Sequence, residues 1–319
     1  LHERMILMQS SGNMNISGIV KLVKRIVIGT CIFEGIGAII LSFSFIPRMG
    51  FWEGLYNGIF HSISAFCNAG FDIMGKYQPF SSFTGYETNA VVSITIAMLI
   101  VIGGIGFLVW DDMLKNKLNF KEYSLHSKIV LITTVALITL GTLGYYVFEA
   151  EGNLIGLTKP QKILSSLFMS VTTRTAGFNT MDLTTISESG TLLSIILMFI
   201  GGSPGSTAGG IKTTTLAVVI ISAISMAKGS DDNRVFKKRL EDGILKQAAV
   251  ITYVYLGGVL LATMLISWIE KLSMSTVMFE VVSAAATVGL SKGITPDLEG
   301  ISKLILIILM YAGRIGAIS

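Results

Sequence analysis

The stretch LFMSVTTRTAGFN, residues 167–179, decides the fold because two other parts of the chain repeat its pattern. The segments FHSISAFCNAGFD (60–72) and FEVVSAAATVGLS (279–291) align with it on a glycine. The aligned glycines, separated by 107 and 112 residues, are Gly70, Gly177 and Gly289. Each has a bulky apolar residue ten positions before it and another directly after it, and a small polar residue two positions before it. Repetition at a near-constant period indicates one structural unit used three times.

The composition is that of an integral membrane protein. Of the 319 residues, 14% are charged and 51% hydrophobic, with a mean hydropathy of +0.70, whereas a soluble domain carries about 25% charged residues. Strand-like alternation is absent, so we expect an all-α fold, and the modest net charge of +4 does not indicate nucleic-acid binding. Apolar runs of about 20 residues predict membrane spans. Six are expected, at 26–46, 90–110, 127–149, 191–226 (interrupted), 247–269 and 301–318.

Lys and Arg residues are divided unevenly among the loops. Segments 1–25, 111–128 and 227–247 hold 4, 4 and 6 of them, and the alternate loops hold seven in all. Because positive residues favour the cytoplasmic side, we expect these three segments there. The other side holds eleven acidic residues: Glu53, Asp72, Glu87, Glu149, Glu151, Asp182, Glu188, Glu270, Glu280, Asp297 and Glu299. Such a face either concentrates cations at a pore mouth or is an ordinary solvated rim, and charge alone leaves both open.

Each aligned segment lies between two expected spans but is too short to cross a bilayer itself, which predicts a re-entrant hairpin. A half-helix entering from outside points its partly negative C-terminus at the membrane centre, where it favours a cation. The backbone beyond it can aim carbonyl oxygens at a dehydrated ion, and glycine permits the torsions this needs. Helix packing would explain one such glycine, but not three in matched contexts. The expected selectivity filter comprises Asn68, Ala69, Gly70, Phe71, Thr175, Ala176, Gly177, Phe178, Thr287, Val288, Gly289 and Leu290.

Three hairpins leave a ring of carbonyls around an ion incomplete. Segment 1–25 reads like a cytoplasmic connection that follows a fourth hairpin. We therefore expect a further repeat upstream, of about 100 residues by the observed period.

The span expected at 191–226 is interrupted by GGSPGSTAGGIKT (201–213). A nucleotide-binding P-loop would need G-x-x-x-x-G-K-[ST] after a strand, but Lys212 comes one residue late and the context is a membrane helix. Glycines and Pro204 unwind a helix, and Ser203, Ser206, Thr207 and Lys212 are expected to face a water-filled pore below the filter. The alternative is a kinked helix with small residues for close packing. The expected gate comprises Gly201, Gly202, Ser203, Pro204, Gly205, Ser206, Thr207, Ala208, Gly209, Gly210, Lys212 and, from the last span, Arg314.

Several charged residues fall inside the expected membrane segments. Arg314 is interpreted either as an electrostatic barrier below the filter or as a tether for carbonyls of 201–210, with snorkelling from a helix end as the alternative. Arg174 is expected to brace the filter from behind, and Glu34 and Glu280 are unpaired candidates for its partner. Asp72, two residues after Gly70, is expected to attract ions at the entrance.

Three glycine-centred P-loops in one chain, GGSPGSTAGGIKT within one repeat and YAGRIG (311–316) in the last span together resemble the Ktr/Trk/HKT superfamily of potassium transporters. Within it the chain is most similar to the bacterial Ktr membrane subunit. The resemblance implies M1–P-loop–M2 repeats with pseudo-fourfold symmetry around a central pore, three of the four being present. The implied divisions are a cytoplasmic linker 1–25 after a missing first repeat, then 26–115, 116–230 with an intramembrane gate loop at 201–214, and 231–319, truncated at its C-terminus.

The resemblance also implies a function. The expected protein is not an enzyme; it takes up K⁺ through a gated pore in a bacterial plasma membrane, with K⁺ held by filter carbonyls and no organic cofactor. It implies a homodimer seated on a cytosolic RCK-type (KTN-type) nucleotide-binding ring, for which loops 111–128 and 228–246 are the docking surfaces expected by position. Ktr-type members often depend on Na⁺, which nothing in these residues establishes. A Trk-type potassium transporter subunit and a sodium-preferring member of the superfamily remain the alternatives.

Overall fold

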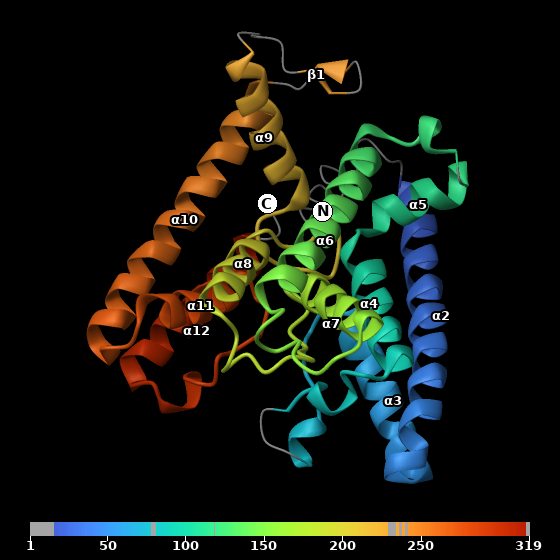
Figure 1. Cartoon of the computed structure of the whole chain (residues 1–319). Helices are drawn as coiled ribbons and strands as arrows, with labels where there is room; N and C mark the ends of the chain where they lie inside the picture. The colour runs from blue at the N-terminus through green and yellow to red at the C-terminus, as the bar shows by residue number, and fades with distance from the viewer. Residues whose placement is uncertain are drawn as a thin grey trace.

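A computed structural model of the chain describes residues 16–77, 81–117, 119–228, 234–235, 238–239 and 242–316. Within these residues one order of elements recurs three times, namely a long helix, a short helix, a glycine-containing segment and a further helix (Figure 1). We name each unit after its aligned glycine. Residues 1–15 of the expected linker 1–25, and residues 229–233, 236–237 and 240–241 of the expected docking loop 228–246, lie outside the described residues.

The Gly70 unit contains α2 (Ile16–Met49), α3 (Phe51–Phe66), α4 (Ala90–Gly104) and α5 (Phe107–Asn116). The Gly177 unit contains α6 (Leu125–Phe148), α7 (Lys159–Thr172), α8 (Glu188–Phe199) and α9 (Thr213–Ala227). The Gly289 unit contains α10 (Asp242–Glu270), α11 (Met274–Ala285) and α12 (Gly300–Gly316). Short 3₁₀ turns lie at Met74–Lys76, Thr84–Tyr86, Phe120–Glu122 and Thr295–Asp297. The described strands are β1 (Arg234–Val235) and β2 (Lys238–Arg239), which form a small antiparallel hairpin.

Polar side chains fix where several helices begin. Asn89 Oδ1 accepts the amides of Val91 and Val92 at the start of α4, and Ser187 Oγ accepts the Gly190 amide at the start of α8. Such caps satisfy amides that have no partner within the helix. The short helix α7 begins with a capping box between Thr158 and Gln161.

The expected spans differ from the observed helices in one important place. Residues 90–110 do not form one span, because α4 ends at Gly104 and α5 leaves at 93° after it. Gly106, with φ +96°, makes this turn, a torsion that glycine adopts without a Cβ penalty. The interruption expected in 191–226 is present, since α8 ends at Phe199 and α9 begins at Thr213.

Helix length and composition identify fewer uninterrupted spans than the six expected. Among the described residues three helices can cross a membrane, Val20–Met49, Leu125–Phe148 and Leu245–Glu270, and a fourth if the bent pair α4–α5 counts as one. The third helices of the three units, α4, α8 and α12, have 15, 12 and 17 residues.

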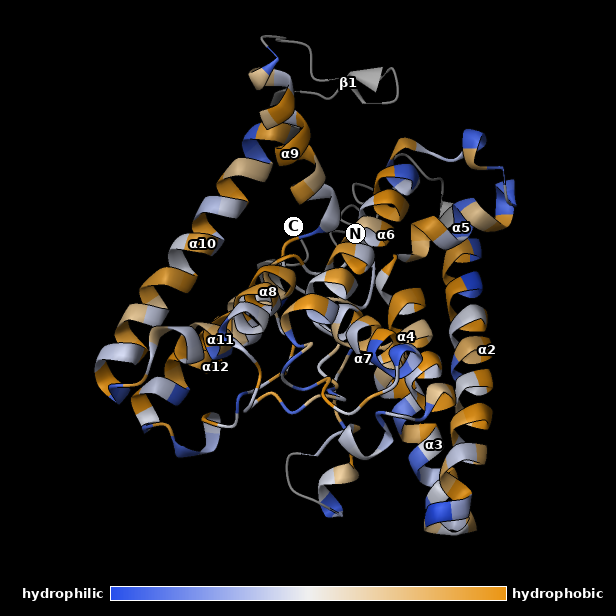
Figure 2. Ribbon diagram, in the orientation of Figure 1, coloured by the Kyte–Doolittle hydropathy of each residue, from blue (hydrophilic) through white to orange (hydrophobic). Residues whose placement is uncertain are grey.

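Burial is distributed as expected for a protein in lipid. Large apolar side chains are exposed along α2, α6 and α10, for example Phe43 at 75% and Trp268 at 80%, which is far more apolar surface than a soluble monomer exposes. Figure 2 shows apolar residues along α2 and α10, with hydrophilic residues gathered near their ends. By contrast, Ser166, Thr172 and Thr175 at the centre are completely buried.

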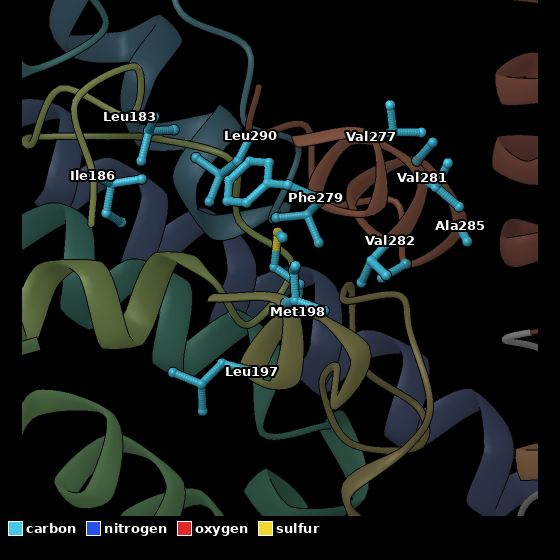
Figure 3. Packing of buried hydrophobic residues seen from close by; sticks show 14 of the residues in the cluster. Leu183, Ile186, Leu197, Met198, Val277, Phe279, Val281, Val282, Ala285 and Leu290 are labelled. Atoms are coloured by element: carbon cyan, nitrogen blue, oxygen red, sulfur yellow. The ribbon is translucent and has the colours of Figure 1, made fainter. Parts of the chain in front are cut away.

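The short helices are held by apolar packing that surrounds the glycine segments. One cluster joins α11 to α8, and Figure 3 shows Phe279 and Val282 near Met198, with Leu290 beside them. A second cluster joins α2, α3 and α4 to Phe178, the residue after Gly177. Neighbouring units therefore share their cores, which brings the three glycine segments together.

Candidate functional site

The three short helices all end just before an aligned glycine. The helix α3 ends at Phe66, α7 at Thr172 and α11 at Ala285, which is four, five and four residues before Gly70, Gly177 and Gly289. The C-terminus of a helix carries a partial negative charge. Three such ends therefore face the same region, and this arrangement favours a cation there.

The backbone of the three glycine segments repeats in detail. The glycines have φ of +70°, +91° and +93°. The residues two positions earlier also have positive φ, namely Asn68 at +48°, Thr175 at +65° and Thr287 at +55°. The residue between each pair is not among the positive-φ residues. Alternating signs of φ turn successive carbonyls toward one side of the chain, whereas an extended strand points them to opposite sides.

The three glycines lie against one another. A Cβ placed on Gly70 would lie 2.4 Å from the Ala176 carbonyl oxygen, and one on Gly177 would lie 2.3 Å from the Val288 oxygen and 3.0 Å from Gly70 Cα. A Cβ on Gly289 would have only Gly177 Cα within 4 Å, at 3.9 Å. Only glycine allows the first two approaches, because a real Cβ would overlap a main-chain atom.

Nine carbonyl oxygens in these segments are not used by the protein. In the described part of the chain none of them accepts a hydrogen bond; they belong to residues 68–70, 175–177 and 287–289. Buried carbonyls are almost always paired. Five of the nine residues are buried, whereas Ala69, Gly70 and Thr287 are half-buried and Gly289 is exposed. The unpaired carbonyls of three segments in contact are therefore available to bind water or an ion.

The carbonyls directly after Gly70 and Gly177 differ from these nine, because each accepts a hydrogen bond. The Phe71 carbonyl accepts a hydrogen bond from Ser64 Oγ at 2.7 Å, and the Phe178 carbonyl accepts one from Thr172 Oγ1 at 2.5 Å. These carbonyls are thus engaged by their own short helix. These two hydroxyl contacts were not predicted from the sequence, although each hydroxyl lies in the last turn of a short helix before an aligned glycine.

Residues 200–212 form a compact loop between α8 and α9, and its two ends lie side by side. Ile200 and Ile211 form a parallel β-bridge, the Gly201 amide donates to the Ile211 carbonyl at 2.9 Å, and the Gly202 amide donates to the Gly209 carbonyl at 3.1 Å. Small residues permit this contact, since a Cβ on Gly201 would lie 1.9 Å from the Gly209 oxygen. We call residues 200–212 the central loop.

The central loop contacts the inner end of all three glycine segments. Thr207 Oγ1 donates to the Phe66 carbonyl at 3.1 Å, where α3 ends. The Gly209 amide donates to Thr175 Oγ1 at 3.2 Å, and a Cβ on Gly209 would lie 2.0 Å from Thr287 Oγ1. The loop is therefore centred beneath the three segments.

The neighbouring units also hold the central loop from the side. Carbonyls of Gly103 and Gly104 accept the amides of Thr207 and Ser203, and the Gly205 carbonyl accepts the Phe107 amide. Arg314 Nη1 donates to the Thr207 carbonyl at 3.3 Å, which is the contact that the tether interpretation requires. Lys212 Nζ donates to the Ala208 carbonyl at 2.9 Å.

The remaining expected gate residues differ in exposure. Ser203 does not face water, because it is completely buried and its hydroxyl bonds Thr213 Oγ1 at 2.9 Å. Gly205 at the tip is exposed, Pro204, Ser206 and Thr207 are half-buried, and Ala208 and Gly210 are buried. Ser206 Oγ donates to the Ser203 carbonyl at 2.6 Å and closes the turn at Pro204.

The ion pairs considered for the charged residues around the site do not form among the described residues. Arg174 is 5% exposed and donates to Thr134 Oγ1 at 3.4 Å. Within the described residues neither Glu34 nor Glu280 forms an ion pair with it. Glu34 Oε1 lies 3.9 Å from Cys67 Sγ, and Glu280 binds donors beyond Gly289.

Not all of the acidic residues expected on the outer face are exposed to solvent. Glu149 is completely buried, and its Oε1 accepts the Ser187 amide at 3.1 Å and the Ser187 hydroxyl at 2.6 Å. It thereby stabilises the positive N-terminus of α8. Asp72 is half-buried and accepts the Met74 amide at 3.0 Å.

Comparisons with known proteins agree on one family. The family model described as "TrkH: Cation transport protein" matches residues 6–319. The chain is 38% identical over 318 residues to the "Potassium/sodium uptake protein NtpJ" of Enterococcus hirae, covering 98% of this chain and 69% of that protein. It is 35% identical over 321 residues to the "Ktr system potassium uptake protein B" of Bacillus subtilis, covering 100% of this chain and 71% of the relative.

A solved structure has the same fold. The crystal structure of the potassium transporter TrkH from Vibrio parahaemolyticus matches with a TM-score of 0.75 and 17% identity, over 96% of this chain and 64% of the other. At that identity the match concerns the fold alone. The chain thus spans between 64% and 71% of the length of these three proteins.

Proposed function

The chain belongs to the TrkH family of cation transport proteins, and we propose that it is a membrane subunit through which K⁺ is taken up. It is a multi-pass protein of the bacterial plasma membrane. Both relatives described above carry potassium uptake in their names. The observation that carries the proposal is the group of nine unpaired carbonyls around Gly70, Gly177 and Gly289.

The ion is held by main-chain oxygens. The three helix ends supply a favourable potential, and the alternating backbone presents carbonyls that replace the water of a dehydrated cation. Residues 68–70, 175–177 and 287–289 are its ligands. Phe71 and Phe178 of the expected filter act as walls instead, because their carbonyls are bonded to Ser64 and Thr172.

The ring is completed by a fourth hairpin equivalent to the three described. Gly70 and Gly177 each approach a carbonyl of the following unit, whereas Gly289 has no such carbonyl within 4 Å of its Cβ position among the described residues. That place suits the carbonyl of a fourth segment. The divisions 26–115, 116–230 and 231–319 then correspond to the second, third and fourth repeats.

The central loop is the gate. It lies beneath the three glycine segments and contacts each of them, so an ion leaving them must pass it. A cavity of about 440 Å³, lined by Ile211, Lys212 and Gly313 among others, adjoins the loop and gives it room to move. Arg314 holds the loop closed through the Thr207 carbonyl.

Regulation comes from outside this chain. The proposed assembly is a homodimer on a cytosolic nucleotide-binding ring of RCK type. The α5–α6 connection and the β1–β2 hairpin are described parts of its docking surface. Arg25 of α2 pairs with Asp111 of α5, which also pairs with Lys115 of its own helix. The Arg25–Asp111 pair ties α5 to α2 and lets a force on this connection reach the membrane helices.

Uptake by the purified protein in vesicles tests the proposal. With K⁺ or Rb⁺ outside, we expect uptake that exceeds Na⁺ uptake at equal gradients. Sodium preference is the second candidate, because one relative is named for both ions, and Na⁺ uptake exceeding that of K⁺ would establish it. The absence of uptake of either ion by folded protein reconstituted with its partners would contradict both.

A further inference from the structure

One position is chemically different in the three units although it is structurally equivalent. Nine residues before each glycine stand His61, Phe168 and Glu280. Each lies within a short helix, α3, α7 or α11. They are 0%, 1% and 5% exposed. A buried imidazole and a buried carboxylate in membrane helices need a reason, because burying such groups costs free energy unless they are hydrogen-bonded.

Glu280 holds the backbone just beyond Gly289. Its Oε1 accepts the Lys292 amide at 2.7 Å and the Ser291 hydroxyl at 2.8 Å, and its Oε2 accepts the Thr295 hydroxyl at 2.8 Å. All three donors belong to the segment that follows the glycine. The carboxylate is therefore fully engaged in fixing that segment.

His61 does the same for the segment beyond Gly70. Its Nδ1 lies 2.7 Å from the Asn57 carbonyl, which can only accept, so Nδ1 carries the proton. Nε2 is then the acceptor and receives the Ile73 amide at 3.3 Å. The ring also contacts Phe178 of the next unit, with 6.5 Å between centroids.

We call His61 and Glu280 the two anchors, and each holds the backbone at the same position relative to its glycine. Ile73 and Lys292 each lie three residues after the aligned glycine, so a side chain at minus nine accepts the amide at plus three in both units. Phe168 offers no acceptor. In the Gly177 unit the neighbouring loop holds the segment instead, since the Asn179 amide donates to Ser82 Oγ at 3.2 Å and the Phe83 amide donates to the Asn179 carbonyl at 2.9 Å.

We infer that His61 and Glu280 are positioning residues that set ion selectivity; this rests on the filter proposed above. The free carbonyls make no hydrogen bonds of their own, so their directions depend on how the segment is fixed at its two ends. The inner end is fixed by the short helix, through the Ala69 amide on the Ser64 carbonyl at 2.9 Å and the Val288 amide on the Ser283 carbonyl at 2.8 Å. The outer end is fixed by the anchors and, in the Gly70 unit, also by the hydroxyl of Ser64 on the Phe71 carbonyl.

Loss of an anchor removes a restraint from one end of a carbonyl-bearing segment. The ligands can then relax around a smaller ion, so discrimination between K⁺ and Na⁺ falls while the path stays open. The side chains do not touch the ion, so the effect is on selectivity more than on the amount of folded protein.

Paired substitutions separate the anchor from general packing. His61→Gln places an oxygen near the position of Nε2 and keeps the acceptor, whereas His61→Asn reaches only the position of Nδ1 and loses it. Glu280→Gln keeps an oxygen for the Lys292 amide, and Glu280→Leu removes it. Phe168→Leu is the matched control, because it changes packing at the equivalent position without touching an anchor.

The measurement is the ratio of K⁺ to Na⁺ uptake in vesicles, together with the yield of folded protein. We expect His61→Asn to lower the ratio by about three- to tenfold, the worth of one hydrogen bond. Glu280→Leu removes the acceptor of three hydrogen bonds and is expected to lower the ratio at least as far. His61→Gln, Glu280→Gln and Phe168→Leu keep the ratio near that of the parent. If Glu280→Leu does not fold, Glu280→Asp draws the oxygens back by one methylene and is expected to give the same fall.

Two outcomes overturn the inference. One is an unchanged ratio in both anchor-removing variants, and the other is an equal fall in Phe168→Leu. Failure of the parent protein to distinguish K⁺ from Na⁺ would count against the proposed filter itself, and is thereby distinguished from failure of the anchors.

Discussion

Replacement of Gly177 by alanine is expected to abolish most selective uptake. A Cβ at this position would lie 2.3 Å from the Val288 oxygen, so that carbonyl must retreat by about 1 Å to reach an ordinary contact. The backbone torsion of +91° adds strain of about 1–2 kcal/mol for a residue with a side chain. The overlap itself costs about 1–3 kcal/mol.

Gly156→Ala provides the matched control. Gly156 has φ +83°, nearly that of Gly177, but a Cβ there would meet nothing within 4 Å. Both variants carry the torsional strain, so their difference isolates the close approach to Val288. A difference of about 1–3 kcal/mol corresponds to roughly a fivefold to hundredfold loss of selective uptake.

The assay compares Rb⁺ and Na⁺ uptake by the two variants in vesicles, at equal amounts of folded protein. Gly177→Ala should lose Rb⁺ uptake or its preference over Na⁺, and Gly156→Ala should retain both. Equal behaviour of the two variants would refute the idea that Gly177 is needed for the approach of a carbonyl to the ion path.

Four further variants probe the ring and the gate. Deletion of 203–210 joins ends of the central loop that already touch, and it should raise ion flux; unchanged or lower flux in folded protein would contradict a gate. Arg314→Gln removes the charged donor to Thr207 and should raise uptake by up to about tenfold, whereas unchanged uptake would exclude a tether. Arg314→Lys, which keeps the charge, should fall between the two if charge also matters. Gly289→Ala should be as damaging as Gly177→Ala if a fourth hairpin places a carbonyl against Gly289, and nearly as mild as Gly156→Ala if none does; uptake assays distinguish these.

The sequence predicted the membrane-helical fold and the interrupted helix because both leave a local signal. A run of apolar residues identifies a span, and a run of small residues with Pro204 identifies a break. The three glycines were also predictable as a group, since close approach and positive φ each exclude a side chain. All three do have positive φ, and they lie together.

Other features had no local signal. Residues 90–110 are predominantly apolar throughout, so hydropathy did not reveal that the helix turns by 93° at Gly106. Glu149 appeared to be a surface acid because its partner Ser187 is 38 residues away. The equivalence of His61 and Glu280 was not evident from the sequence. Their side chains differ in size and charge and share only the ability to accept a hydrogen bond.

Diffraction from crystals grown with Rb⁺ tests most directly whether these carbonyls bind an ion. We expect an anomalous peak between Gly70, Gly177 and Gly289, within coordination distance of carbonyls from residues 68–70, 175–177 and 287–289. Glycine segments that lie apart, or a peak held by side chains elsewhere in the protein, would contradict a backbone filter.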